Sequence, residues 1–271
     1  SVAAFLAIAA VYALKAVRHP GAVAAEWHHP VRLAFFPAIS ISLLLIATAL
    51  RSHAEEAARL LWLAGAAGQG ALTIAVVSGW IGRRPFQPMH ISPAWFIPAV
   101  GNVVVPVAGV PLGFVELSWL FFSAGLIFWV VLLTLVVNRL IFHDPLPGRL
   151  LPTLVILIAP PAVAFLAWAQ LSGGGDDAFG RILLNTAYVF AAVVALQVPA
   201  LARLPFALSF WALSFPVAAL AIASMRFAEL AGSAAHLWIG GAVLALLVVI
   251  VLGLVGRTAL AIARGEICLP E

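Results

Sequence analysis

Long apolar stretches alternate along the chain with short polar connections, and most stretches have the length of a membrane-spanning helix. About 20 apolar residues in a helix cross the hydrocarbon core of a bilayer. The pattern predicts nine helical segments, over residues 2–17, 33–50, 58–80, 93–113, 114–139, 151–171, 182–201, 208–228 and 237–255. We therefore expect an all-helical protein that crosses the membrane many times.

Four of these segments are interrupted by a proline followed by small or branched apolar residues. The prolines are Pro37, Pro98, Pro161 and Pro216, which lie 61, 63 and 55 positions apart. Two spans with their connections take about 60 residues, so the recurrence predicts repeated helical hairpins with one kinked member each. Proline removes a backbone donor, and in a bilayer the freed carbonyl must face protein or a water-filled path. We expect the interrupted helices to line such a path.

Composition agrees with a membrane protein. Of the 271 residues 65% are hydrophobic and 9% are charged, whereas soluble domains carry about 25% charge. We expect one transmembrane transport domain over residues 1–271. The chain begins with Ser1 and reaches Lys15 and Arg18 after a stretch short for a full crossing. This predicts that the first segment is the tail of a longer helix and that the chain is truncated at its N-terminus.

The basic residues fall mainly at alternate connections. Ten share one side of the predicted membrane and four share the other. The ten are Lys15, Arg18, Arg32, Arg83, Arg84, Arg139, Arg149, Arg203, Arg257 and Arg264, and the four are Arg51, Arg59, Arg181 and Arg226. The positive-inside rule places the side with ten in the cytoplasm. Because the basic residues do not cluster on one soluble face, we expect no nucleic-acid partner.

Several kinds of chemistry are disfavoured by the residues present. The only lysine, Lys15, follows no glycine-rich loop, and the only cysteine is Cys268. These facts argue against a phosphate-binding loop, a disulfide and a thiolate metal site. His28 and His29 are adjacent, and adjacent side chains on a helix diverge by about 100°. We expect no metal and no cofactor.

A few polar side chains lie inside the apolar segments. They are Ser40, Ser42, Gln69, Thr73, Asn102, Asn185, Thr186, Ser214 and Ser224. Taken singly, each is most simply explained by a hydrogen bond between helices, worth about 1 kcal/mol or less. Ser40, Asn102 and Ser214, however, lie within four residues of a proline. There, hydroxyl or amide groups together with exposed backbone could serve a hydrated path.

Three ordered stretches of the chain resemble the tellurite-resistance/dicarboxylate transporter family, which includes bacterial TehA proteins and plant slow anion channels. They are AEWHHPVR followed by FFPAIS over residues 25–40, SPAWFIPAVGN over residues 92–102 and FWALSFP over residues 210–216. The resemblance implies ten helices in five hairpins, with the kinked helices around a central pore. By that count the segments here are helices two to ten. The family commonly forms trimers, so the resemblance also implies a homotrimer.

The resemblance assigns a role to Phe215, which precedes the proline of the ninth helix of the family. There the phenylalanine ring occludes the pore, and an aromatic ring across a narrow apolar tube excludes the water an anion needs. Without the resemblance, Phe215 would be taken for one of 17 packing phenylalanines. The same comparison makes pore-lining candidates of Pro37, Ser40, Pro98, Asn102, Pro161, Ser214 and Pro216. Arg83, Arg84 and Arg203 could concentrate anions at the cytoplasmic mouth.

The interpretation favoured by the sequence is a passive channel for small anions in the inner or plasma membrane. A proton-coupled carrier of C4-dicarboxylates or tellurite is the alternative within transport, although no carboxylate or histidine lies mid-span to carry a proton. An intramembrane enzyme is the alternative of another class. It would be favoured by a reactive cluster around His143 and Asp144.

Overall fold

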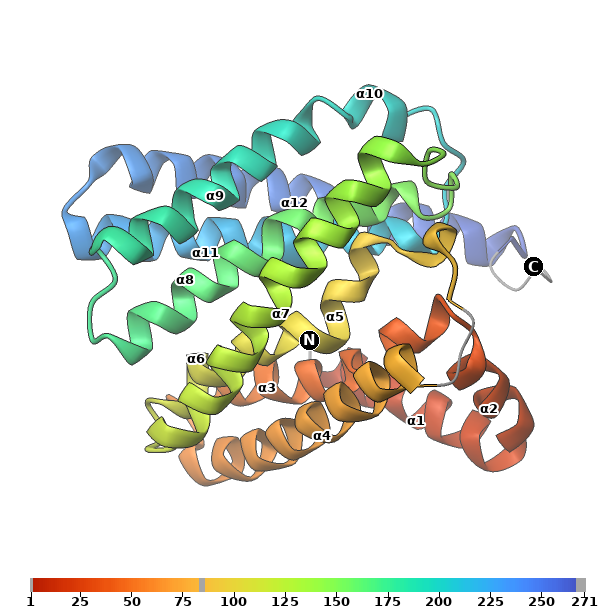
Figure 1. Ribbon diagram of the computed structural model, residues 1–271, viewed down its shortest axis with the longest axis horizontal. Helices are drawn as coiled ribbons and strands as arrows, with labels where there is room; N and C mark the ends of the chain where they lie inside the picture. Colours follow the sequence, from red (N-terminus) through yellow and green to blue (C-terminus); the bar gives the residue numbers. More distant parts are fainter. Residues whose placement is uncertain (1, 83–85, 267–271) are drawn as a thin grey trace. The chain divides into compact units, whose positions relative to one another are not determined.

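The computed structural model describes residues 2–82 and 86–266, and every secondary-structure element within these ranges is a helix (Figure 1). The chain divides into two compact units, Ser1–His143 and Asp144–Glu271. The label α marks an α-helix and the label η a 3-10 helix. The predicted all-helical fold is confirmed.

The first unit begins with a helical elbow, the bent pair of helices over residues 2–28, and continues with two hairpins. Its elements are α1 (Val2–Arg18), α2 (Pro20–His28), η1 (Arg32–Phe35), α3 (Ala38–Leu50), α4 (Glu55–Gly82), η2 (Pro88–His90), η3 (Pro93–Trp95), α5 (Phe96–Val100), η4 (Gly101–Val104), α6 (Val105–Gly109) and α7 (Val115–Phe142). Helix α3 packs along α4, and the broken run from α5 to α6 packs along α7 (Figure 1). Each hairpin thus pairs an interrupted helix with a long continuous one.

The second unit repeats this arrangement. Its elements are η5 (Leu151–Ile158), α8 (Ala159–Leu171), α9 (Ala178–Ala195), α10 (Val198–Leu201), η6 (Leu208–Leu213), α11 (Ser214–Ala231) and α12 (Ala234–Ala263). Helix α8 packs on α9 and α11 packs on α12, while α11 also contacts α8 (Figure 1). The predicted repeat of hairpins with one interrupted member is therefore present four times.

Within the described residues, seven helices are long and apolar enough to cross a membrane. They cover Arg32–Leu50, Glu55–Gly82, Val115–Phe142, Leu151–Leu171, Ala178–Ala195, Leu208–Ala231 and Ala234–Ala263. Helices α1 and α2 would form an eighth span only as a pair, and they bend by 104°. The run Pro93–Gly109 is shorter. In the second unit, 72% of an 18-residue window of the interrupted span Leu151–Leu171 is buried, against 28% for its partner α9. The interrupted helix is therefore the inner member of this hairpin.

Prolines explain where the helices differ from the predicted segments. The segment predicted over residues 182–201 ends as an α-helix at Ala195, and α10 follows separately. The ring of Pro199 would clash with the carbonyl four residues earlier, at Ala195. The segment predicted over residues 93–113 is divided into four short helices, two of which contain Pro98 and Pro106. A continuous helix cannot satisfy its backbone across both positions.

The recurring prolines lie where the helix type changes. Pro37 immediately precedes α3 after η1, Pro161 lies in the first turn of α8 after η5, and Pro216 lies in the first turn of α11 after η6. Pro98 lies in the first turn of α5, after η3. The first turn of an α-helix tolerates proline because its N–H groups have no partner within the helix. These prolines therefore mark 3-10-to-α junctions, at which the helix begins anew.

Two glycines allow close helix packing in the first unit. A Cβ atom added to Gly65 of α4 would lie 2.9 Å from Leu44 Cγ and 3.1 Å from the carbonyl oxygen of Ser40. A Cβ atom on Gly125 of α7 would lie 2.7 Å from Val103 Cγ1 and 3.0 Å from the backbone nitrogen of Val103. Small residues let backbones approach closely in membranes. Gly65 and Gly125 thus allow α4 and α7 to pack closely against the interrupted helices.

Asp177 fixes the turn between α8 and α9, outside the spans. Its carboxylate accepts hydrogen bonds from the backbone N–H of Gly180 at 2.8 Å and from Nε1 of Trp168 at 2.8 and 3.0 Å. The Gly180 N–H, helped by the indole, holds the pKa of Asp177 below its ordinary value. Because this pKa is lowered, the stabilisation by the cap is present at neutral pH and is lost as the pH falls through the lowered pKa.

The charge pattern makes a testable prediction about sidedness. Asp176 and Arg203 are both exposed and flank the single span α9, with Arg203 after α10. In a Cys268→Ala background and in right-side-out membrane vesicles, a membrane-impermeant thiol reagent should label Asp176→Cys and leave Arg203→Cys unlabelled. Labelling of both positions to the same extent would contradict the assignment of Arg203 to the cytoplasmic side.

Candidate functional site

Polar side chains at the helix junctions bond to the backbone three residues earlier. Ser40 Oγ lies 2.8 Å from the carbonyl oxygen of Pro37, Asn102 Nδ2 donates to that of Ala99 at 2.8 Å, and Ser214 Oγ donates to that of Trp211 at 2.8 Å. Thr153 repeats this contact in the first turn of η5, with its hydroxyl 2.6 Å from the carbonyl oxygen of Leu150. The three polar residues selected from the sequence therefore share one local role.

Gln69 of α4 connects two of the interrupted helices. Its Oε1 lies 2.8 Å from Ser40 Oγ of α3, and its Nε2 donates to the carbonyl oxygen of Pro98 in α5 at 3.1 Å. Thr73, one turn further along α4, places its hydroxyl 2.7 Å from the same Pro98 oxygen and 3.2 Å from Asn102 Oδ1. Ser40, Gln69, Thr73 and Asn102 are all at least 93% buried. Hydrogen bonds between helices thus account for Ser40 and Asn102, and their place along an anion path stays a prediction.

The same face of α4 carries Trp62, which neither polarity nor motif singled out. Its side chain is fully buried, Nε1 donates to the carbonyl oxygen of Val105 at 2.9 Å, and the indole stacks on Phe114 with centroids 4.5 Å apart. Residues 62, 69 and 73 are seven and four positions apart, a spacing that puts them on one helical face. That spacing is the sequence signal from which these three residues could have been predicted to share a face.

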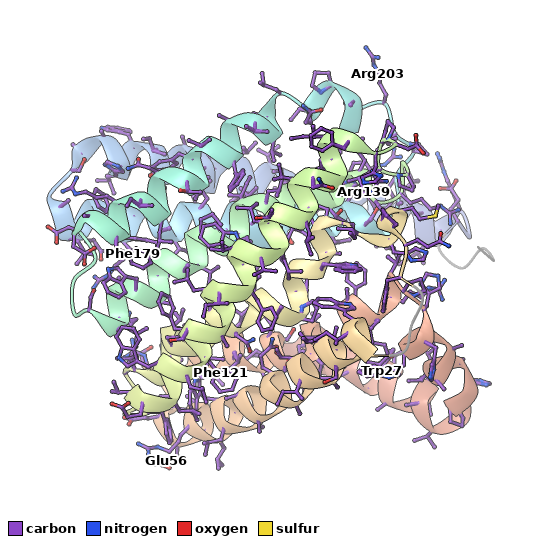
Figure 2. The ribbon with its side chains drawn as sticks, in the orientation of Figure 1. Trp27, Glu56, Phe121, Arg139, Phe179 and Arg203 are labelled. Carbon is purple, nitrogen blue, oxygen red and sulfur yellow. The ribbon has the colours of Figure 1, made fainter. Side chains whose placement is uncertain are left out.

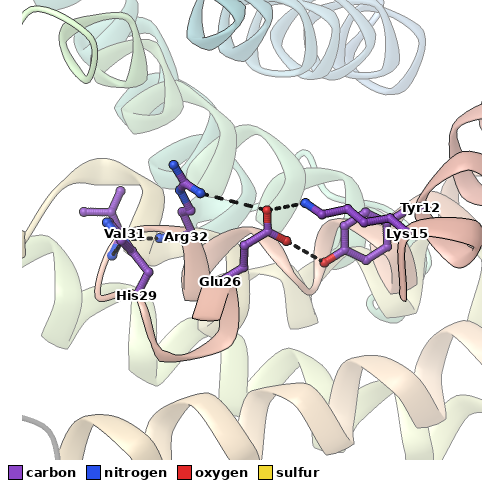
Figure 3. A network of polar contacts seen from close by, with 6 residues as sticks. All are labelled: Tyr12, Lys15, Glu26, His29, Val31 and Arg32. Carbon is purple, nitrogen blue, oxygen red and sulfur yellow. Dashed lines mark hydrogen bonds and ion pairs between the residues drawn. The ribbon is translucent and has the colours of Figure 1, made fainter. Parts of the chain in front are cut away.

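The stretch around Glu26 forms an ion-pair network at the elbow (Figure 3). Glu26 Oε1 lies 2.6 Å from Lys15 Nζ and 4.0 Å from Arg32 Nη1, and Tyr12 donates its hydroxyl to Oε2 at 3.1 Å. His29 Nδ1 accepts the backbone N–H groups of Val31 and Arg32. The network links α1 and α2 to η1, which is the beginning of the first interrupted span, Arg32–Leu50.

Aromatic contacts extend the elbow to the first junction. The ring of Phe36, directly before Pro37, is met edge-on by Trp27 at 5.0 Å and by Tyr12 at 6.5 Å between centroids. Trp27 belongs to α2 and is labelled in Figure 2. These contacts couple the start of α3 to α1 and α2.

Phe215 lies at the junction of η6 and α11, between Ser214 and the buried Pro216. Its side chain is half-buried, and it makes no ring contact within the part of the chain that the structure describes. Phe210, by contrast, stacks on Phe206 at 6.0 Å between centroids. The preceding turn is held by Trp211, whose Nε1 donates to Thr258 Oγ1 of α12 at 3.0 Å. Among the described residues Phe215 therefore has no aromatic partner, and the turn before it is held to α12 by Trp211.

The charged candidates are placed as follows. Arg203 is exposed after α10 and points away from the ribbon in Figure 2. Arg83 and Arg84 lie outside the described residues. His143 and Asp144 are exposed. Among the residues described, no group of three His, Cys, Asp or Glu side chains is placed to hold a metal ion.

Comparison with protein families identifies the chain. Residues 1–259 match the family described as SLAC1, voltage-dependent anion channel. The chain belongs to this family. Its members are polytopic helical membrane proteins that act as anion channels or transporters and not as enzymes. The predicted resemblance to TehA proteins and slow anion channels is confirmed, and the enzyme alternative is set aside.

Individual relatives agree with the family. The chain is 30% identical over 236 residues to the S-type anion channel SLAH3 of Arabidopsis thaliana, covering 86% of this chain and 37% of the relative. It is 28% identical over 220 residues to the tellurite resistance protein TehA homolog of Haemophilus influenzae, covering 80% and 66%. It is 23% identical to the guard cell S-type anion channel SLAC1 of Arabidopsis thaliana, covering 84% and 42%. The chain thus spans less than half the length of these two plant channels.

Proposed function

We propose that this protein is a passive channel for small anions in the inner or plasma membrane, with Phe215 as its gate. Membership of the anion-channel family is the observation that carries the proposal. The four proline junctions add support because each unit supplies two interrupted helices. We propose that these helices line the path, and that the protein works as a homotrimer.

The physical basis of gating is exclusion of water. An aromatic ring in a narrow apolar path removes the water that an anion needs, and a dehydrated charge in a low-dielectric medium is opposed by a very large free energy. Phe215 supplies such an aromatic ring, and the ring is half-buried beside a proline. Arg203, with Arg83 and Arg84, would raise the anion concentration at the cytoplasmic mouth.

The proposal is tested by ion substitution with the protein reconstituted in liposomes. Chloride or nitrate should move down its gradient, large organic anions should not follow, and an imposed proton gradient should leave the flux unchanged. A flux that requires the proton gradient would instead assign the protein to the coupled carriers of dicarboxylate or tellurite.

A further inference from the structure

Backbone carbonyls at the helix junctions accept more hydrogen bonds than a regular helix gives them. The carbonyl oxygen of Pro37 accepts the backbone N–H of Ile41 at 3.0 Å and lies 2.8 Å from Ser40 Oγ. That of Leu150 accepts the N–H of Thr153 at 2.9 Å and also the Thr153 hydroxyl. A carbonyl oxygen has two lone pairs, and at these junctions a side chain is positioned at the second.

Pro98 is the clearest case because both of its side-chain donors come from another helix. Gln69 Nε2 lies 3.1 Å and Thr73 Oγ1 lies 2.7 Å from the Pro98 carbonyl oxygen. The other contacts of these donors are longer or shared. Gln69 Nε2 is 3.4 Å from Thr73 Oγ1. The Thr73 hydroxyl shares its single proton among the carbonyl oxygen of Pro98, that of Gln69 at 2.8 Å and Asn102 Oδ1 at 3.2 Å. Both side chains are buried.

A bare carbonyl oxygen beside an ion path favours cations. Carbonyl dipoles present partial negative charge, and rings of such oxygens replace the hydration shell of potassium in cation channels. An anion would be repelled by the same oxygens, more strongly in a low-dielectric surrounding than in water. A hydrogen-bond donor aimed at the oxygen offsets that partial charge, so a path with broken helices can admit anions when its carbonyls are covered.

We infer that Gln69 and Thr73 determine ion selectivity by capping the Pro98 carbonyl, so that the broken helix presents no uncovered oxygen to an anion. The inference rests on the proposed channel function. It makes α4, the continuous partner in its hairpin, a contributor to selectivity. The same inference extends to the polar side chains that bond to a carbonyl oxygen three residues earlier at their own junctions, which are Ser40, Asn102, Thr153 and Ser214.

Reversal potentials test this inference in the intact protein carrying Phe215→Ala, under a sodium chloride gradient. Thr73→Val keeps the side-chain shape and removes the hydroxyl. It should lower the chloride-to-sodium permeability ratio by about fivefold, the factor given by loss of one hydrogen bond of about 1 kcal/mol. Thr73→Ser should restore the ratio. Gln69→Met removes the other donor and should act like Thr73→Val.

The matched control is Thr134→Val. Thr134 of α7 is exposed and donates to the carbonyl oxygen of Val130, four residues earlier, as Thr73 does to Gln69. Among the described residues its hydroxyl bonds to no second helix. Its ratio should equal that of the parent. An unchanged ratio in Thr73→Val and Gln69→Met in a conducting protein would overturn the inference alone. A parent that passes no anions would refute both the inference and the proposed function. Loss of both variants from the membrane, with Thr134→Val retained, would assign the network to folding.

Discussion

Replacement of Phe215 by alanine should raise anion conductance about 100-fold, which corresponds to a barrier lowered by about 2.7 kcal/mol. The ring lies half-buried beside Pro216 and has no aromatic partner among the described residues. Removing it should therefore open space for water instead of emptying a packed core. Conductance per molecule, measured in planar bilayers or liposomes with the amount of inserted protein determined separately, checks the result.

Phe210→Ala is the matched control because Phe210 lies five residues earlier in the same span. Its ring stacks on Phe206, so truncation should weaken local packing and leave conductance low. The gate belongs elsewhere if Phe210→Ala opens the path as well as Phe215→Ala does. It also belongs elsewhere if Phe215→Ala only destabilises the protein, as Phe→Ala in a close-packed core does by about 3–5 kcal/mol.

Trp62→Ala should be the most destabilising of the substitutions considered, with a loss of about 3–5 kcal/mol in the free energy of unfolding. The substitution removes a fully buried indole, ends its stacking on Phe114 and leaves the carbonyl oxygen of Val105 without this donor. The indole also fills the space beside Gly109, where an added Cβ would lie 2.5 Å from its Cζ2. Thermal unfolding of the purified protein in detergent measures the change.

Trp238→Ala provides the comparison with the same change of side chain. Trp238 of α12 is 79% exposed, so its removal should shift the unfolding temperature little. Equal destabilisation by the two variants would mean that Trp62 does not anchor the run from η4 to α6 against α4. A stable Trp62→Ala variant would mean the same.

The sequence was sufficient for seven of the nine predicted spans among the described residues because a bilayer imposes its constraint locally. Every backbone group in lipid must be satisfied within its own helix, so an apolar run of sufficient length specifies a helix without knowledge of its neighbours. The proline spacing likewise predicted the hairpins, since Pro37, Pro98, Pro161 and Pro216 recur at the length of two spans. Ser40, Asn102 and Ser214, selected because they lie near these prolines, bond to the backbone at the junctions, and their place along an anion path stays a prediction.

The sequence alone determined the helical class, the approximate spans, the hairpin repeat and the membership of an anion-channel family. Tertiary structure decided which side chains meet. Gln69 reaches Pro98, 29 residues away, and Lys15 reaches Glu26 across the bend between α1 and α2. A helix that is apolar on all sides does not reveal which face meets its neighbour, because each residue turns the direction by about 100°. Close packing at Gly65 limits the rotation of α4 against α3, and in that orientation Trp62 and the pair Gln69 and Thr73 face carbonyls of the broken helix.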